Sequence, residues 1–146
     1  MLKSKKGFTL IELLVVIAII GLLSTLSILA LNTARARSRD ARRVADIKQI
    51  QTALEMYYND MSTYPATASV TPGARLSTVN GTYMAAIPTP PTPTNDGSCP
   101  ATTGTDNKYT YAMVTGGNSY TMTYCTGAAV NDITAGWHTA TPTGIR

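Results

Sequence analysis

The chain has 146 residues, 44% of them apolar, with eight prolines, eleven glycines and a formal net charge of +4. This length suits one domain with its own core plus an appendage, and it is short for two domains. From Ser62 onward the charges balance, three basic against three acidic: Arg75, Lys108 and Arg146 against Asp96, Asp106 and Asp132. A neutral distal half rich in Thr and Ser offers no phosphate-binding stripe, so nucleic acid is not expected as a partner.

The first element is a long apolar run from Phe8 to Leu31. As a helix, 24 residues would extend roughly 36 Å, enough to cross a hydrocarbon core of about 30 Å with some tilt. Basic residues flank the run on both sides: Lys3, Lys5 and Lys6 before it, and Arg35, Arg37, Arg39, Arg42 and Arg43 after it. The run is therefore a candidate transmembrane segment.

Helical periodicity continues beyond the apolar run. Apolar residues recur three or four positions apart between Val44 and Met61, with polar residues between them, and no proline occurs before Pro65. We expect one nearly continuous helix from about residue 9 to about residue 60. Its length of roughly 80 Å is too great for the remaining chain to cover, so lipid or helices of neighbouring subunits must bury its first half.

The region from residue 62 to 108 is rich in turn signals, among them Asn80-Gly81 and the proline-rich stretch from Ile87 to Gly97. We expect it to be mostly loop. Between residues 109 and 124, Tyr and Met occupy every second position on both sides of the sequence TGGN. This pattern predicts a β-hairpin with TGGN as its turn, whose Tyr and Met face packs on the helix. A further short strand is expected near residues 137 to 141, followed by a C-terminal loop.

Cys99 and Cys125 are the two cysteines of the chain. A disulfide is expected if this half lies outside the cytoplasm, and two buried thiols are the alternative. Two cysteines and the lone His138 are too few for a structural zinc site, which needs about four ligands. We expect His138 to be a surface or capping residue.

Glu12 lies inside the apolar run. Burying a carboxylate at membrane depth costs free energy, so such a residue is by default functional and has a partner. Two alternatives are that Glu12 lies near the membrane surface, or that it is protonated and inert. If the chain were cut between Gly7 and Phe8, the new amino group of Phe8 could neutralise Glu12 of an adjacent chain.

The sequence KKGFTLIELLVVIAIIG, residues 5 to 21, resembles the N-terminal signature of type IV pilins and of the pseudopilins of type II secretion systems. The resemblance implies a leader of residues 1 to 7, cleavage by a prepilin peptidase after Gly7, and an N-methylated Phe8 at the mature N-terminus. Glu12 would be the fifth mature residue. Residues 39 to 65 are also similar to the amphipathic half of such subunits.

The resemblance further implies a filament-forming structural subunit with no enzymatic activity and no cofactor. Subunits would wait in the inner membrane, and an assembly ATPase and a platform protein would then move them into a homopolymer. Glu12 would meet the Phe8 amine of a neighbour and set the register. The filament would be an extracellular pilus or a periplasmic pseudopilus, and a DNA-uptake pilin is a weaker alternative.

One observation opposes export. Five Arg after the apolar run against three Lys before it would place the distal half in the cytoplasm by the positive-inside rule. The leader signature and the cysteine pair favour export nonetheless. The arginines from 35 to 43 are expected either to pair with Asp40, Asp46 or neighbours or to form a solvated collar.

Two other functions compete with a filament subunit. The residues Ala34-Arg35-Ala36 offer a signal-peptidase site, but cleavage there would leave Glu12 unexplained. A tethered enzyme or metal-binding domain lacks any catalytic grouping that spacing supports. The acidic residues Asp96, Asp106 and Asp132 show no EF-hand spacing for calcium, so we expect solvated turn residues.

The expected fold is α+β, a long N-terminal helix packed against a small antiparallel sheet. We divide the chain into a leader, a transmembrane or filament-core helix, an amphipathic helix, a helix-to-sheet loop region, and a hairpin with C-terminal loop and disulfide: residues 1–7, 8–31, 32–61, 62–108 and 109–146.

Overall fold

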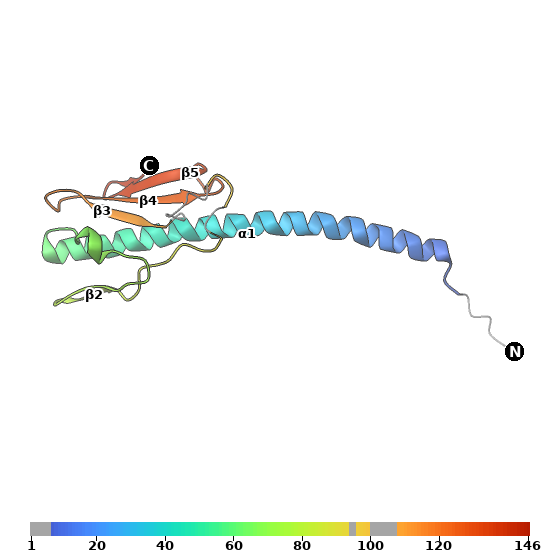
Figure 1. The fold of residues 1–146 in the computed structure, drawn as a ribbon, viewed down its shortest axis with the longest axis horizontal. Helices are drawn as coiled ribbons and strands as arrows, with labels where there is room; N and C mark the ends of the chain where they lie inside the picture. Colours follow the sequence, from blue (N-terminus) through green and yellow to red (C-terminus); the bar gives the residue numbers. More distant parts are fainter. Residues whose placement is uncertain (1–6, 94–95, 100–107) are drawn as a thin grey trace. The chain divides into compact units, whose positions relative to one another are not determined.

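A computed structural model describes residues 7–93, 96–99 and 108–146. It contains one long α-helix, a short 3-10 helix and six strands (Figure 1). The chain divides into two units, residues 1–35 and residues 36–146. In chain order the elements are α1 Leu10–Met61, η1 Thr67–Ser69, β1 Leu76–Thr78, β2 Gly81–Met84, β3 Thr110–Met113, β4 Tyr120–Thr126, β5 Gly136–Thr141 and β6 Gly144–Ile145.

The first unit consists of the N-terminal part of α1 and the residues just before it. Every Phe, Leu, Ile and Val side chain between Phe8 and Leu31 is at least 45% exposed. The helix is long and apolar enough to cross a membrane, and none of its most apolar window is buried by the described chain. Removing this much apolar surface from water requires lipid or other chains.

The second unit forms its core where α1 meets the larger sheet. Ile47, Ile50 and Leu54 are at most 1% exposed, and they recur at the three- and four-residue spacing of one helix face. On the sheet, Tyr120, Met122 and Tyr124 alternate along β4 and are fully buried in the same core. The predicted packing of the Tyr and Met face on the helix is therefore confirmed.

The larger sheet is antiparallel, with strand order β3-β4-β5-β6. β3 and β4 form the predicted hairpin, and β5 is the strand expected near residues 137 to 141. β6 was not expected, because it contains only two residues after a turn at Pro142-Thr143, which is too short to show any periodicity. It replaces part of the predicted C-terminal loop.

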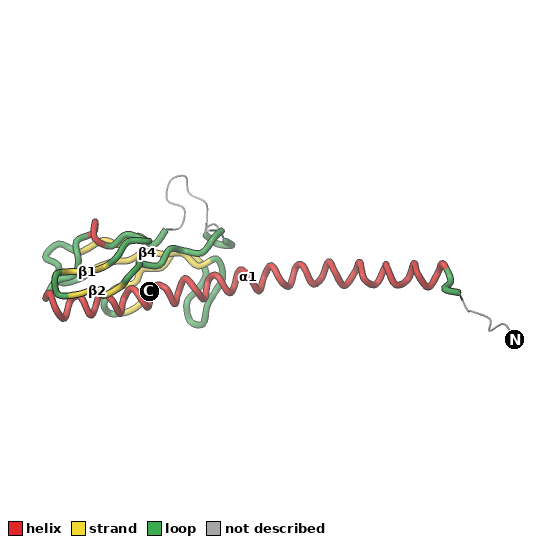
Figure 2. Tube along the Cα trace, turned by 90° about the horizontal axis from the view of Figure 1, so that it is seen from below, coloured by secondary structure: helices red, strands yellow, loops and turns green. Residues whose placement is uncertain are grey.

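A second, two-stranded sheet lies within the region expected to be loop. β1 pairs with β2 across a turn at Val79-Asn80, next to the predicted Asn80-Gly81 signal, and Figure 2 shows both strands beside α1. Tyr83 of β2 anchors this hairpin, because its hydroxyl donates to Asp60 at 2.9 Å and its ring contacts that of Tyr57. The turn was recognised from the sequence, but three- and four-residue strands with an irregular register carry too little alternation to be predicted.

Candidate functional site

The start of α1 is fixed by a reciprocal pair of contacts between Thr9 and Glu12. The Thr9 amide and hydroxyl donate to Glu12 Oε2 at 2.8 and 2.6 Å, and the Glu12 amide donates to the Thr9 hydroxyl at 3.3 Å. This is a capping box, in which a residue just before the helix and one in its first turn satisfy each other's backbone amides. Sequence reasoning missed Thr9, although the spacing Thr-x-x-Glu before an apolar run was a readable signal.

The capping box leaves one oxygen of Glu12 available. Oε2 takes both bonds from Thr9, whereas Oε1 has no hydrogen-bond partner among the residues that the structure describes. Glu12 borders an apolar hollow on the helix, with Phe8, Ile11 and Val15 around it, and Phe8 is 83% exposed. The predicted cleavage junction, Gly7-Phe8, lies outside regular secondary structure, directly before this cap.

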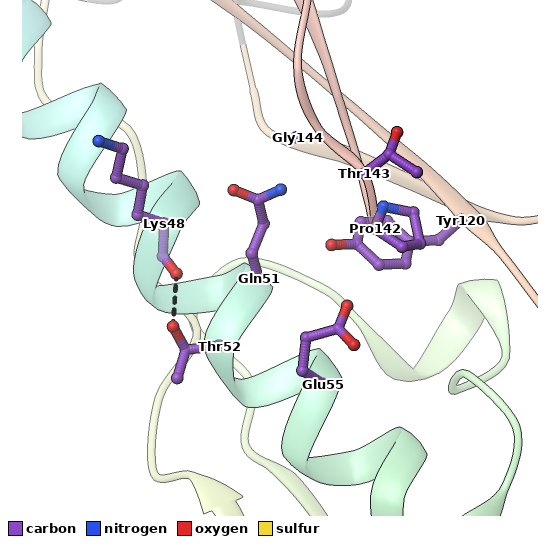
Figure 3. A pocket seen from close by; sticks show the side chains of 8 residues that line it. All are labelled: Lys48, Gln51, Thr52, Glu55, Tyr120, Pro142, Thr143 and Gly144. Atoms are coloured by element: carbon purple, nitrogen blue, oxygen red, sulfur yellow. Dashed lines mark hydrogen bonds between the residues drawn. The ribbon is translucent and has the colours of Figure 1, made fainter.

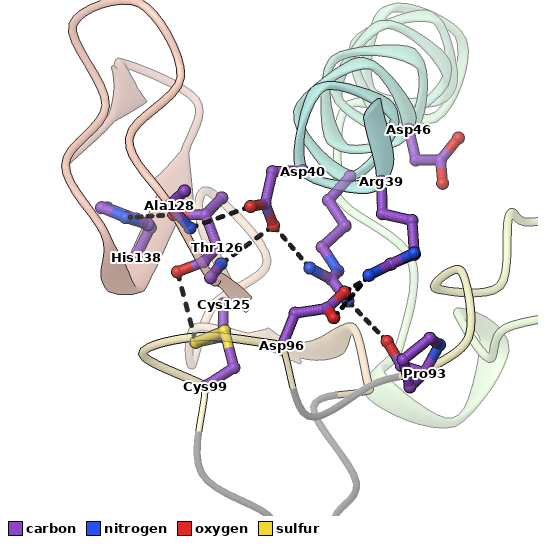
Figure 4. A network of polar contacts seen from close by, with 12 residues as sticks. Arg39, Asp40, Asp46, Pro93, Asp96, Cys99, Cys125, Thr126, Ala128 and His138 are labelled. Carbon is purple, nitrogen blue, oxygen red and sulfur yellow. Dashed lines mark hydrogen bonds and ion pairs between the residues drawn. A yellow bond between two sulfur atoms is a disulfide. The ribbon is translucent and has the colours of Figure 1, made fainter. Parts of the chain in front are cut away.

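A second polar cluster ties the amphipathic part of α1 to the proline-rich segment (Figure 4). Arg39 donates two parallel hydrogen bonds to the Asp96 carboxylate, at 2.6 and 2.7 Å. Arg43 donates to the same carboxylate at 3.1 Å and to the Pro93 carbonyl at 3.0 Å. These contacts lower the pKa of Asp96 below its usual value, although burial acts in the opposite direction. The hydrogen bond from Arg39 has the largest effect.

Asp40 connects the same cluster to the sheet. It is fully buried, pairs with Arg43, and accepts hydrogen bonds from the amides of Gly127 and Ala128 at 2.9 and 2.8 Å. The expected pairing of arginines with Asp40 is thus present, and Arg43 is 1% exposed rather than part of a solvated collar.

One expectation about acidic residues needs correction, and one of the alternatives for the arginines is not realised. Asp96 is not a solvated turn residue, because it is 8% exposed and paired with two arginines. Asp46 pairs with no arginine in the described chain and instead accepts a hydrogen bond from the Tyr109 hydroxyl at 2.9 Å. Burial raises the pKa of Asp46.

The disulfide lies beside this cluster. Cys99 and Cys125 are joined, with Cα atoms 5.8 Å apart, and each is at most 2% exposed. Next to it, Gly97 has a φ of +51° and lies so close to Gly127 that a side chain there would overlap the Gly127 carbonyl. Disulfide, ion pairs and close backbone contact together fix the segment around Asp96 on the sheet.

His138 is not the surface or capping residue that was expected. It is 7% exposed, and its Nε2 lies 2.7 Å from the Thr134 carbonyl and 3.2 Å from the Thr126 hydroxyl. The reason is strand alternation, since positions 138 and 140 of β5 both turn to the buried face. Within the described residues, no three His, Cys, Asp or Glu side chains gather in a way that could hold a metal.

Comparison of the sequence with known proteins shows the family to which the chain belongs. Residues 2–28 match the prokaryotic N-terminal methylation motif. The type II secretion system core protein G of Klebsiella michiganensis is 35% identical over 99 residues, which cover 61% of this chain and 69% of that protein. The chain belongs to the type IV pilin and pseudopilin family. It is a pilin-like filament subunit.

Other relatives match over a shorter stretch. The core protein G of Escherichia coli K12 is 40% identical over 63 residues, or 43% of each chain. A fimbrial protein of Pseudomonas aeruginosa is 43% identical over 54 residues, or 37% of this chain and 35% of that protein. In both relatives the match covers less than half of their length. No solved structure matches the chain significantly.

Proposed function

We propose that this pilin-like chain is made as a membrane precursor with the leader 1–7, is cut by a prepilin peptidase between Gly7 and Phe8, and polymerises with copies of itself. The observation that carries this proposal is the exposed apolar part of α1, with Glu12 capped by Thr9 at its start. A surface of this kind is stable in lipid before assembly and among other apolar helices afterwards.

Glu12 would register each incoming subunit. Its Oε2 is already held by Thr9, so the carboxylate is oriented before assembly, and Oε1 remains available for the N-methylated amine of Phe8 on a neighbouring chain. A subunit out of register would keep an unpaired charge in apolar surroundings. Such a charge is energetically unfavourable, so the correct register is preferred.

The partners and the location follow from the same scheme. The precursor would lie in the inner membrane, and an assembly ATPase with a platform protein would drive its transfer into the filament. The Cys99–Cys125 disulfide supports an oxidising compartment for residues 36–146. No enzymatic activity is proposed, since the family to which the chain belongs is structural.

A second candidate is a major-type pseudopilin of a type II secretion system. One observation favours it over a surface pilus: the match to a core protein G reaches 69% of that protein, whereas the match to the fimbrial protein covers 35%. A filament confined to the periplasm would distinguish this candidate from an extracellular pilus. A DNA-uptake pilin is less well supported, because the distal half is neutral.

Processing and registration can be tested together. Mass spectrometry of assembled protein is expected to show a chain that begins at methylated Phe8. Glu12→Ala should insert and be processed normally but yield roughly tenfold fewer filaments. The reason is that the Phe8 amine of the neighbouring chain would be left without its partner in apolar surroundings.

Ser27→Ala provides the control for the registration test. Ser27 lies in the same apolar stretch, and its hydroxyl donates to the Leu23 carbonyl of its own helix, so its loss should leave the yield unchanged. A wild-type filament yield from Glu12→Ala would reject the registration role, and a mature chain that begins elsewhere than Phe8 would reject the processing scheme.

A further inference from the structure

The tip of the β1–β2 hairpin carries an asparagine that is open to reaction. The turn consists of Val79, which is 100% exposed, and Asn80, which is exposed as well. Among the described residues, the Asn80 side-chain amide donates only to the thioether sulfur of Met61, a weak acceptor, at 3.8 Å. The Asn80 amide is therefore in contact with solvent and only loosely held.

Gly81 follows Asn80 and exposes its backbone nitrogen. Asn80 is the one asparagine in the sequence that precedes a glycine. A side chain on the following residue would shield its backbone nitrogen, and glycine has none. Beyond its immediate neighbours, no described atom lies within 4 Å of the position that a Cβ of residue 81 would occupy. The turn thus has room for a ring that joins the Asn80 side chain to the Gly81 nitrogen.

We propose that Asn80 is a self-modifying site, whose reactants are the Gly81 amide and water. The Gly81 nitrogen bonds to Asn80 Cγ, the bond from Cγ to Nδ2 breaks, and ammonia leaves with the proton of the Gly81 amide. Water then opens the resulting succinimide at one of its two carbonyl carbons. The products are an aspartate at position 80 or an isoaspartate, whose main chain is one CH₂ longer. No redox step is involved, and the reaction does not depend on the filament function.

The modification would act on the attachment of the hairpin to α1. Asn80 and Asp60 line the same hollow, and the Tyr83 hydroxyl of β2 donates to Asp60 at 2.9 Å. A carboxylate at position 80 would place a second negative charge near Asp60, which is unfavourable. Isoaspartate would instead lengthen the two-residue turn across which Thr78 pairs with Gly81. Both products should therefore loosen the β1–β2 hairpin.

Asn118 provides a control within the same chain. It lies exposed in the turn between β3 and β4, and the next residue is Ser119, which has a side chain. Peptide mapping of the full chain incubated in detergent at neutral pH should show a mass gain of about 1 Da at Asn80, because a hydroxyl replaces the amide nitrogen. We expect this reaction to be at least about tenfold faster at Asn80 than at Asn118. Equal rates would overturn the proposal.

Asn80→Gln tests the ring itself. Glutamine keeps the amide but would have to close a six-membered ring, so the rate of modification at position 80 should fall at least about tenfold. In the wild type the rate should rise with pH, because the attacking group is the deprotonated Gly81 amide. A rate that is unchanged in Asn80→Gln, or that does not rise with pH, would reject the attack by Gly81.

Hydrogen exchange tests the effect on the hairpin. The amides of β1 and β2 should exchange several-fold faster in the incubated chain and in Asn80→Asp than in the fresh wild type, because fewer contacts oppose local opening. Asn118→Asp adds the same charge to the other hairpin turn and should leave β1 and β2 unchanged. Unchanged exchange in the incubated chain would overturn the loosening of the hairpin.

A glycan is the competing modification at this residue, since the sequence Asn80-Gly81-Thr82 also matches an N-glycosylation acceptor. A sugar on Asn80 Nδ2 would substitute the group that has to leave as ammonia. Peptide mapping of the chain from its native cells distinguishes the two: a gain of about 1 Da at Asn80 supports the proposal, and the mass of a glycan there overturns it. Because no readout uses filament yield, failure here would leave the proposed function untouched.

Discussion

At the scale of single residues, the molecule pairs its few charges in specific ways. Asp40 is stabilised by Arg43 and two backbone amides and Asp96 by two arginines, whereas Asp46 accepts a hydrogen bond from the Tyr109 hydroxyl and makes no ion pair within the described residues. Two carboxyls in the same unit therefore respond to pH in opposite directions. The pKa of Asp96 is lowered by its partners, and that of Asp46 is raised by burial.

Asp96→Asn should destabilise the chain by about 1 to 3 kcal/mol at pH 7, because Arg39 loses its carboxylate partner and the buried Arg43 loses one of its two, keeping Asp40. A carboxyl with a lowered folded pKa stabilises the fold above its unfolded pKa, near 3.8, and the effect is lost as pH falls through the folded value. We expect the free energy of unfolding in urea to fall less between pH 7 and pH 2.5 in the variant than in the wild type.

Asp46→Asn is the control for this comparison. Its raised folded pKa means that its ionised form is disfavoured in the fold, so its contribution weakens as pH rises above the unfolded value of about 3.8. We expect a change of less than about 1 kcal/mol at pH 7. A larger loss for Asp46→Asn than for Asp96→Asn would contradict the assignment of Asp96 as the paired carboxylate.

At the scale of elements, α1 combines two different helix designs. Its first part is apolar on all sides and exposed, and its second part buries a single stripe, in which Ile47 and Leu54 pack under the sheet. The first design depends on lipid or neighbours, and the second on the chain's own strands. The first part begins with the Thr9–Glu12 capping box, and the second part is held by the contacts of Arg39, Asp40 and Arg43.

Thr9→Ala should fray the first turn of α1, because the Glu12 amide loses its acceptor and Glu12 loses the hydroxyl donor. Loss of such a cap typically costs about 1 kcal/mol. Hydrogen exchange of the full chain in detergent should show faster exchange confined to residues near 10 to 13. Thr9→Ser keeps the hydroxyl and should exchange as the wild type does; faster exchange in both variants would argue against the cap.

At the scale of the whole molecule, the contacts that close residues 36–146 join segments far apart in sequence. Arg39 and Asp96 are 57 residues apart, and Asp40 and Ala128 are 88 residues apart. The disulfide adds a covalent link across 26 residues in the same region. Bringing such distant segments together costs the unfolded chain conformational entropy. A cross-link reduces this cost and so has a large effect on the free energy of unfolding.

Cys99→Ser combined with Cys125→Ser should therefore lower the stability of the folded chain by roughly 3 kcal/mol according to the loop-entropy model. The measurement is urea unfolding of the full chain under non-reducing conditions. The wild type treated with reductant after unfolding should refold to the same reduced stability. A double-serine variant as stable as the oxidised wild type would show that the ion pairs alone hold the Asp96 segment.

The sequence by itself determined the helix from Leu10 to Met61, its apolar part, the β3–β4 hairpin and the packing of the Tyr and Met face. These features are periodic over many residues, and periodicity is local information. Even the Thr9–Glu12 cap was readable from a three-residue spacing.

Only the tertiary structure decided the partners of Arg39 and Arg43 and the burial of His138. The pairing of an arginine on α1 with Asp96 rather than Asp46 depends on where a loop with little regular structure crosses the helix, and no spacing in the sequence encodes that crossing. The β1–β2 hairpin and β6 were missed for a different reason, since strands of two to four residues are stabilised by the neighbours they pair with and touch rather than by their own pattern.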